Sequence, residues 1–130
     1  MDFFIARKVR TSGFESLTEK VRQELKKEGF GVITEIDIKK TLKEKINVDF
    51  RNYLILGACN PQFAHRALLA DDKIGVLLPC NVVIQETAAG ELEVMAFDPS
   101  SAMMDSGNAT LIKLSSDIRD KLKQVLESLD

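Results

Sequence analysis

Residues 52–71 read NYLILGACNPQFAHRALLAD and contain the strongest strand signal of the chain, followed directly by a helix signal. In NYLILGAC, both alternating sets of positions carry apolar residues, a pattern that predicts a strand covered on both sides. Asn60 and Pro61 come next, and asparagine favours the N-cap of a helix while proline favours its first turn. The stretch therefore predicts a strand that ends at Cys59 and a helix that begins at Pro61.

Upstream of this stretch, hydrophobic periodicity predicts two strands and two helices. Alternating apolar residues indicate strands, whereas apolar residues spaced three and four apart indicate helices with one buried face. The first helix is expected to close at Gly29. The expected elements are a strand at 2–9, a helix at 14–28, a half-buried strand at 30–38 and a short edge-covering helix within 39–50.

Downstream, the same periodicity predicts a hairpin and a long final helix. The run KIGVLLPCNVVIQE, 73–86, is expected to be extended, and a turn at Gly90 connects it to a strand at 91–98. The stretch 100–108, SSAMMDSGN, is expected to be a mobile loop, with Met103 and Met104 as an adaptable apolar lid or as edge packing. Leucines, an isoleucine and a valine at helical spacing predict an amphipathic helix over 111–129.

This order of elements favours one fold class. It contains no repeated crossover motif and no glycine-rich phosphate loop, so it predicts an α+β two-layer sandwich. The sheet is expected to be mainly antiparallel, with the two long helices on one of its faces. A length of 130 residues is typical of a single domain, and we expect one domain over 1–130.

Charge and hydropathy exclude several kinds of partner. The 18 basic and 20 acidic residues are spread along the chain, so no basic surface is expected that would bind nucleic acid. No apolar run approaches the roughly 20 residues that span a bilayer, so a membrane partner is not expected either. The N-terminal run MDFFIARKVR has the wrong order of charges for a secretory leader, so we expect a cytoplasmic protein.

Three motifs point to a known family. The segments LGACNPQFAHRAL, IGVLLPCNVVIQE and VMAFDPSSAMM carry a Cys-Asn-Pro, a Leu-Pro-Cys-Asn and an Asp-Pro element in that order. In these elements the sequence resembles the family called domain of unknown function 302, and the resemblance covers nearly the entire chain. The resemblance implies a small α+β domain with a helix-covered curved sheet, similar to the TATA-binding-protein architecture. It implies no activity or cofactor, because none is settled for the family.

The two cysteines are the first candidates for chemistry. Cys59 precedes a helix N-terminus, where the helix dipole favours the thiolate, although a cysteine at a strand end is more often a small buried hydrophobe. If the strands that carry Cys59 and Cys80 are antiparallel neighbours, the two thiols meet at one rim of the sheet. A reversible dithiol or disulfide is then an alternative.

Five more residues belong to this predicted rim site. His65 is expected near the surface, beside a buried stripe of Ala64, Ala67 and Leu68, where it can act as a proton carrier. Asn60 and Asn81 follow the two cysteines, and each can cap a helix or hydrogen-bond a polar ligand. The rim residues are completed by Pro61 and Asp98, which ends the last strand. The cysteine and histidine spacing matches no standard zinc module, so no metal is expected.

Three hypotheses for function follow. The first is a binding domain whose rim site, formed by Cys59, Asn60, Cys80 and Asn81, holds a small polar or sulfur-containing molecule, with possible thiol or redox participation. The second is a homodimeric interaction module that pairs through an exposed sheet face. The expected apolar residues of that face are Phe4, Ile33, Met95 and Phe97. The third is an enzyme with Cys59 as nucleophile and His65 as base, for which no orienting group is evident.

Overall fold

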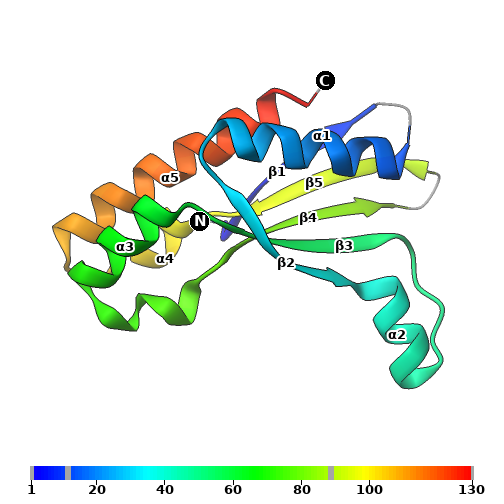
Figure 1. Ribbon diagram of the computed structural model, residues 1–130, viewed down its shortest axis with the longest axis horizontal. Coiled ribbons are helices and arrows are strands. Elements are labelled where there is room, and N and C mark those ends of the chain that lie inside the picture. The colour runs from blue at the N-terminus through cyan, green and yellow to red at the C-terminus, as the bar shows by residue number, and fades with distance from the viewer. Residues whose placement is uncertain (1, 11–12, 88–89, 130) are drawn as a thin grey trace.

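The computed structural model describes residues 2–10, 13–87 and 90–129. It contains one antiparallel sheet and a layer of helices (Figure 1). In chain order, the elements are β1 (Phe4–Val9), α1 (Phe14–Lys27), β2 (Gly31–Asp37), α2 (Ile38–Ile46), β3 (Tyr53–Cys59), α3 (Pro61–Ala70), the 3₁₀ helix η1 (Asp72–Leu77), β4 (Cys80–Glu86), β5 (Leu92–Phe97), α4 (Pro99–Met103) and α5 (Ala109–Glu127).

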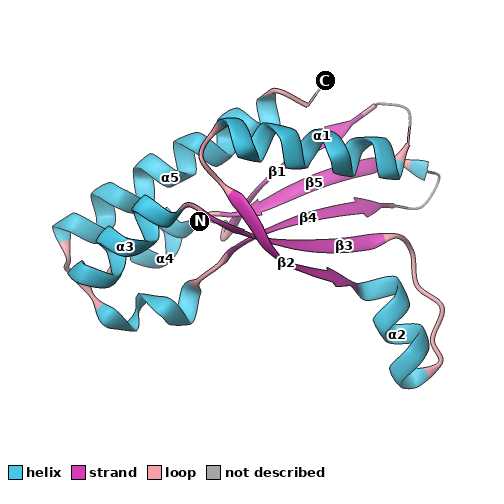
Figure 2. Ribbon diagram, in the orientation of Figure 1, coloured by secondary structure: helices cyan, strands magenta, loops and turns pink. Residues whose placement is uncertain are grey.

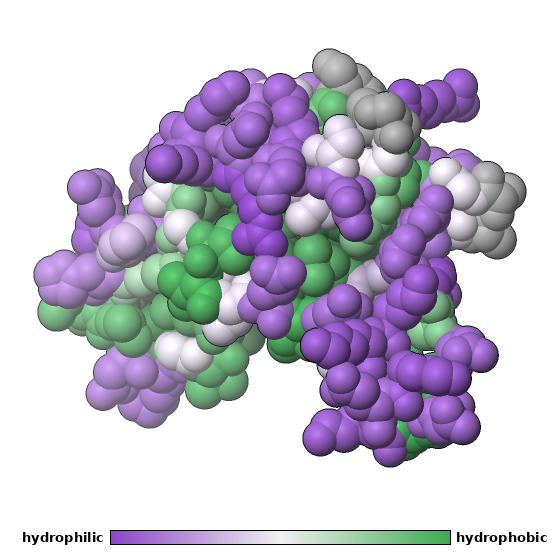
Figure 3. Space-filling model, turned by 45° about the vertical axis from the view of Figure 1, so that its right-hand side comes forward, coloured by the Kyte–Doolittle hydropathy of each residue, from purple (hydrophilic) through white to green (hydrophobic). Residues whose placement is uncertain are grey.

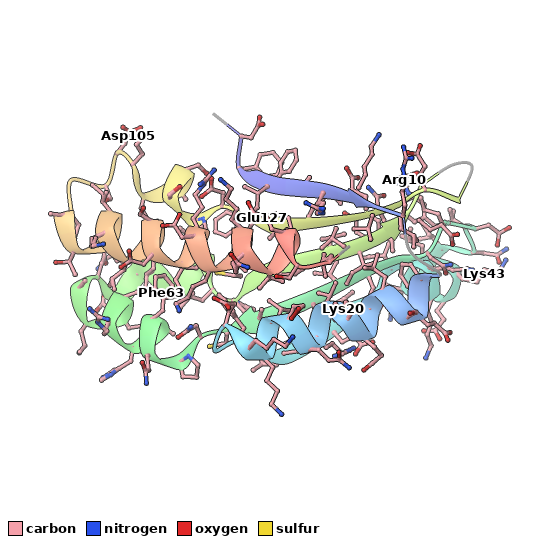
Figure 4. The ribbon with its side chains drawn as sticks, turned by 90° about the horizontal axis from the view of Figure 1, so that it is seen from above. Arg10, Lys20, Lys43, Phe63, Asp105 and Glu127 are labelled. Carbon is pink, nitrogen blue, oxygen red and sulfur yellow. The ribbon has the colours of Figure 1, made fainter. Side chains whose placement is uncertain are left out.

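The predicted α+β two-layer architecture is confirmed. The strands are ordered β1-β5-β4-β3-β2, and every neighbouring pair is antiparallel. The two long helices α1 and α5 lie over the same face of the sheet (Figures 2 and 4). The described part of the chain contains no helix that is long and apolar enough to cross a membrane.

The core lies between the sheet and these two helices. Side chains from the central strands pack there against leucines and valines of α1 and α5, and all of them are almost completely buried. Burying such apolar side chains removes them from water and stabilises the fold. The core residues with the lowest exposure include Leu56, Val82, Ile84 and Val94 of the strands and Val21, Leu25, Leu122 and Val125 of the helices.

The opposite surface of the sheet, here called the open face, has no helix layer over it. The prediction that β3 is covered on both sides is therefore wrong for one side: Leu54 and Leu56 are buried under the helices, whereas Tyr53 and Ile55 are only half-buried. Strand alternation and the register assign the open-face side chains. They are Phe4, Ala6, Lys8, Gly31, Thr34, Ile36, Tyr53, Ile55, Gly57, Cys59, Asn81, Val83, Gln85, Glu93, Met95 and Phe97.

Two helix boundaries follow the local signals of the sequence. α1 ends just before Gly29, which adopts a positive φ of 87° that a glycine tolerates without strain. α3 begins at Pro61 with Asn60 as its N-cap, because the Asn60 side chain accepts a hydrogen bond from the backbone N–H of Phe63. Both predicted boundaries are confirmed.

The segment before β4 differs from the prediction. Residues 73–77 were expected to be extended, but Asp72–Leu77 forms the 3₁₀ helix η1. The carboxylate of Asp71 caps this turn by accepting a hydrogen bond from the N–H of Lys73 at 3.0 Å. This local hydrogen bond outweighs the β preference of the apolar residues that follow, and only Cys80–Glu86 is a strand.

The β2 strand and helix α2 also depart from the prediction. A bulge between Val32 and Thr34 moves these two residues to opposite faces, although simple alternation predicts one face for both. β2 is an edge strand and is mostly exposed rather than half-buried. α2 begins at Ile38, one residue inside the predicted strand, and has no buried residue. It projects from one end of the sheet as a mainly hydrophilic lobe (Figure 3).

The predicted mobile loop at 100–108 begins as helix. Pro99–Met103 forms α4, whose N-cap is Asp98, and the side chain of Met103 is buried in the core. Only Met104 of the two methionines is exposed. Met103 therefore packs in the core, and a lid formed by both methionines is not present.

Candidate functional site

The two Cys-Asn doublets lie at the same end of the sheet, as the antiparallel arrangement predicts. β3 ends at Cys59 and β4 begins at Cys80, with Ala58 paired to Cys80 and Gly57 paired to Asn81. Because successive residues of a strand point to opposite faces, Cys80 lies under the helices while Asn81 lies on the open face. The doublets are adjacent, but their side chains are divided between the two faces.

The two thiols have different environments. Cys80 is 3% exposed and Cys59 is half-buried, and both are free cysteines. Desolvation by burial, together with a smaller effect of the neighbouring Cys59, raises the pKa of the Cys80 thiol from its ordinary value of 9.0 to about 11. Since the thiolate is the reactive form, Cys80 is a poor nucleophile at neutral pH.

Asn60 is held by structural hydrogen bonds. Its Oδ1 accepts the N–H of Phe63 at 3.2 Å, and its Nδ2 donates to the backbone carbonyl of Glu28 at 3.4 Å. A Cβ atom at Gly29 would lie only 3.2 Å from this Nδ2, so the glycine also gives the amide room. Asn60 thus connects the end of α1 to the start of α3 and has little capacity left for a ligand.

Asn60 and Pro61 line a hollow of about 590 Å³ between α3 and α5, here called the α3 hollow. Phe63 lies at the contact between these helices (Figure 4), and the walls combine polar and apolar surface. Its charged lining residues are Lys27, Glu28, Arg66, Asp117 and Lys121. The charges of both signs are exposed to solvent, where such groups interact weakly.

Asn81 lines a different cavity, the open-face hollow, with a volume of about 520 Å³. Its wall at one end comes from η1, and its floor comes from β3, β4, β5 and β1. The lining residues are Phe3, Phe4, Tyr53, Val76, Leu77, Leu78, Pro79, Asn81, Val83, Met95, Ala96 and Phe97. Among the residues described, no hydrogen bond occupies the carboxamide of Asn81 or the hydroxyl of Tyr53. Both polar groups therefore remain available for hydrogen bonds to a ligand.

Gly57 permits the close packing beside Asn81. A Cβ atom at this position would overlap Oγ1 of Thr34 and lie 2.9 Å from Cγ of Pro79. Without a side chain at Gly57, Thr34 and Pro79 approach the β3 backbone from both neighbouring strands. Pro79 follows a cis peptide bond with Leu78, and both residues line the hollow.

His65 is not joined to the cysteines by a hydrogen bond among the described residues. It is exposed on α3, whose buried residues are Phe63 and Ala67 rather than the predicted stripe that included Leu68. Over the described parts of the chain, no hydrogen bond joins His65 to Cys59. A nucleophile and base pair formed by Cys59 and His65 therefore stays a prediction.

Asp98 has a structural environment. It is buried at the start of α4, and its carboxylate accepts hydrogen bonds from N–H and Oγ of Ser100 at 3.0 and 2.6 Å. Nε of Arg119 on α5 donates to its other oxygen at 3.0 Å. Asp98 lines a separate hollow between β1 and α5, away from Asn60 and Asn81.

The predicted rim residues therefore separate into three places. Asn60 and Pro61 line the α3 hollow, Asn81 lines the open-face hollow, and Asp98 lines the hollow beside α5. Neither cysteine is among the described residues that line any of these hollows. Within the described ranges, no group of three or more His, Cys, Asp or Glu side chains is placed to hold a metal ion.

Sequence reasoning missed the η1 wall of the open-face hollow. Val76 and Leu77 were expected in an extended segment, so no reason existed to place them beside Asn81. The signal for η1 was present in the aspartates of LADDKIG, since Asp71 caps the turn.

Comparison with known proteins then places the chain in a family. A family model described as "Domain of unknown function DUF302" matches residues 5–129. The chain belongs to the DUF302 family. It is similar to a crystal structure of an uncharacterized conserved DUF302 protein from Bacillus stearothermophilus, with 29% sequence identity, a TM-score of 0.90 and 98% coverage of each chain. No curated protein matches it.

The DUF302 match confirms the resemblance seen in the three sequence motifs. It also agrees with the fold class, because the matched structure superposes over nearly the full length. Neither match carries an assigned activity, so the function of this DUF302 chain has to be argued from the hollows and surfaces described above.

Proposed function

We propose that this DUF302 protein is a small-molecule-binding domain whose ligand occupies the open-face hollow. The observation that supports this proposal is the unpartnered carboxamide of Asn81 in an otherwise apolar cavity of about 520 Å³. Ligand sites are commonly clefts of roughly 300–1,000 Å³ with apolar walls and a few well-placed polar groups. The open-face hollow has this composition, whereas the α3 hollow is lined by five charged residues and its asparagine already makes two hydrogen bonds.

The lining suggests the chemistry of the ligand. Phe4, Phe97 and Met95 offer aromatic and thioether surfaces, which pack well against planar or aliphatic groups. Asn81 can donate and accept at once, and Tyr53 adds a hydroxyl. We therefore expect a compact, mainly apolar and uncharged molecule with one polar group such as an amide, a hydroxyl or a carbonyl.

The thiols are not required by this proposal. Cys80 is buried and has a raised pKa, and Cys59 is absent from the described lining of the hollow. The part of the earlier hypothesis that remains is the binding of a small molecule, with the Pro-Cys-Asn element contributing Pro79 and Asn81.

The test is binding of the neutral fluorescent probe N-phenyl-1-naphthylamine to the purified protein. Its emission is expected to rise on addition of wild-type protein, because an apolar cavity excludes water from the dye. Val76→Asp places a charge at the wall of the hollow and is expected to weaken probe binding at least about tenfold, since a bound apolar probe would remove water from a lone carboxylate. Val76 is 87% exposed, so the fold should tolerate the change.

Leu69→Asp is the matched control. Leu69 is an exposed apolar residue on the neighbouring helix α3 but does not line the hollow. This variant is expected to bind the probe as the wild type does. Absence of probe binding to the wild type, or an equal loss in both variants, would contradict the proposal.

A further inference from the structure

An apolar row of side chains crosses the whole open face. Each member pairs with the next on the neighbouring strand, so the row is continuous from β1 to β2. In order, it consists of Ala6, Met95, Val83, Ile55 and Ile36. The solvated face of an antiparallel sheet usually carries polar residues in alternation, so this row is unusual for a surface that only water covers.

Exposed apolar side chains extend the row at the end of the sheet near η1. Phe3 is 70% exposed and Val76 is 87% exposed, and Leu77 is exposed beside them. All three line the open-face hollow together with Phe4 and Phe97. The row and this group form one contiguous apolar surface, of the kind that marks an interaction site on a soluble protein.

We infer that the open face is covered by a second copy of this chain in a symmetric dimer. In such a dimer, the same patch must be complementary to itself. Val83 is the middle member of the apolar row and lies on the central strand β4. A two-fold axis that lies between two facing sheets and passes over Val83 places the row of one copy on the row of the other.

The available area agrees with a dimer. Five strands about 4.8 Å apart and about six residues long, at about 3.4 Å per residue, present a face of roughly 24 by 20 Å, or about 500 Å². The exposed side chains beside η1 enlarge this surface. Stable complexes bury roughly 600–1,000 Å² on each partner, so the strand face supplies most of the lower value and the side chains beside η1 have to supply the rest.

The charges on the face favour a second copy over nucleic acid. Among its described strand residues, the charged ones are Lys8 and Glu93, which pair across β1 and β5. Arg51 adds one positive charge at an end of the face, where its guanidinium lies over Tyr53 and donates to Gln85. An excess of one basic group offers little counterion release to a phosphate backbone, and it causes little repulsion when two identical faces approach, because Glu93 offsets Lys8.

This dimer and the proposed ligand site are tested separately. The open-face hollow lies at the edge of the same surface, so a partner copy would form its missing roof. Dimerisation of ligand-free protein needs no ligand, however, and the binding of a fluorescent probe needs no dimer. Either result can therefore fail while the other holds.

The experiment is sedimentation equilibrium of the ligand-free, full-length protein over a range of concentrations. Wild-type protein is expected to show twice the 14.5 kDa mass of the chain and to dissociate on dilution. Met95→Glu is expected to raise the dimer dissociation constant at least about tenfold, because it buries two like charges in the interface. Ile112→Glu on α5, in the opposite layer, is the control and should remain dimeric.

Circular dichroism establishes that each variant is folded. If Met95→Glu does not fold, Ile36→Glu takes its place, because Ile36 is 46% exposed on the edge strand β2. A strictly monomeric wild type would overturn the inference. So would a folded Met95→Glu or Ile36→Glu variant that remains as dimeric as the control, since another surface would then hold the copies together.

Discussion

At the residue scale, the two asparagines that follow the cysteines have different tasks. Asn60 makes two hydrogen bonds that join α1 to α3, whereas Asn81 is exposed on the open face and its side chain has no hydrogen bond within the described residues. Asn60→Ala is expected to lower the free energy of unfolding by about 1–2 kcal/mol, since a helix cap is lost. Urea denaturation measures this change.

Asn81→Ala is the matched control for that variant. It is expected to change the free energy of unfolding by less than about 0.5 kcal/mol, as is usual for surface substitutions. Equal losses in the two variants would show that Asn81 has a structural partner after all. Such a result would also remove the main support for a ligand in the open-face hollow.

Gly57 provides a second prediction at the residue scale. Gly57→Ala forces a Cβ atom against Thr34 and Pro79, and overpacking of this kind costs about 1–3 kcal/mol. Gly31→Ala on β2 is the control, because a Cβ atom there meets no atom within 4 Å. Thermal unfolding is expected to show a clear loss for Gly57→Ala alone. A fully stable Gly57→Ala variant would show that Pro79 and Thr34 do not pack as described.

The Cys80 thiol gives the protein a defined pH dependence. Below about pH 9.0 the thiol is protonated in both the folded and the unfolded state, so it does not change the free energy of unfolding as the pH changes. Between pH 9.0 and about 11, the unfolded chain loses this proton while the folded chain keeps it, which favours unfolding. The stability should therefore fall over this window by roughly 2–3 kcal/mol because of this thiol.

Comparison with Cys80→Ala isolates that contribution. The variant is expected to be less stable near neutral pH, because a buried side chain is shortened, but to lose less stability between pH 9.0 and about 11. Urea unfolding at several pH values measures both curves. Parallel curves for the two proteins would mean that the folded state does not raise the pKa of Cys80.

At the element scale, most of the fold was predictable because its signals are local. The cap at Asn60, the glycine stop after α1 and the helical spacing of α5 each involve residues within one or two turns. The bulge in β2 was not predictable in this way, since it shows only in the pairing of Val32 and Thr34 with β3. η1 was missed because a side chain cap competed with the β preference of its apolar residues.

The candidate site was less predictable than the elements. The sequence places Cys59 and Cys80 at one end of the sheet, and the register puts the two residues on neighbouring strands, one position apart, with their side chains on opposite faces. Strand alternation already puts Cys80 and Asn81 on opposite faces, but the sequence does not reveal which of these faces the helices cover. The separation of Asn60 and Asn81 into different hollows therefore required the three-dimensional structure.

Helix α2 provides a prediction at the element scale. It has no buried residue, so little packing holds it against the sheet, whereas β4 is the central strand with a buried core. Amide hydrogens of α2 are expected to exchange at least about a thousandfold faster than those of β4, since α2 can open without global unfolding. Hydrogen exchange followed by mass spectrometry measures this. Equal protection would indicate a partner that covers α2.

At the scale of the whole molecule, β3 has apolar residues on both faces, and the sequence alone does not say what covers each face. The pattern predicts that both faces are covered, but the helices α1 and α5 cover only one. The same apolar residues are therefore left for something outside the described fold. A small molecule in the hollow and a second copy over the row are both consistent with this remaining apolar surface.

The most direct test of the functional role of the open face is a residue-resolved binding map. Amide chemical shifts of ¹⁵N-labelled protein are recorded while N-phenyl-1-naphthylamine is added. The shifts are expected to change at Asn81, Val83, Met95 and Phe97, around the open-face hollow. Changes confined to Asn60, Arg66 and Lys121 around the α3 hollow, or no changes at all, would contradict the claim that the open face is the binding surface.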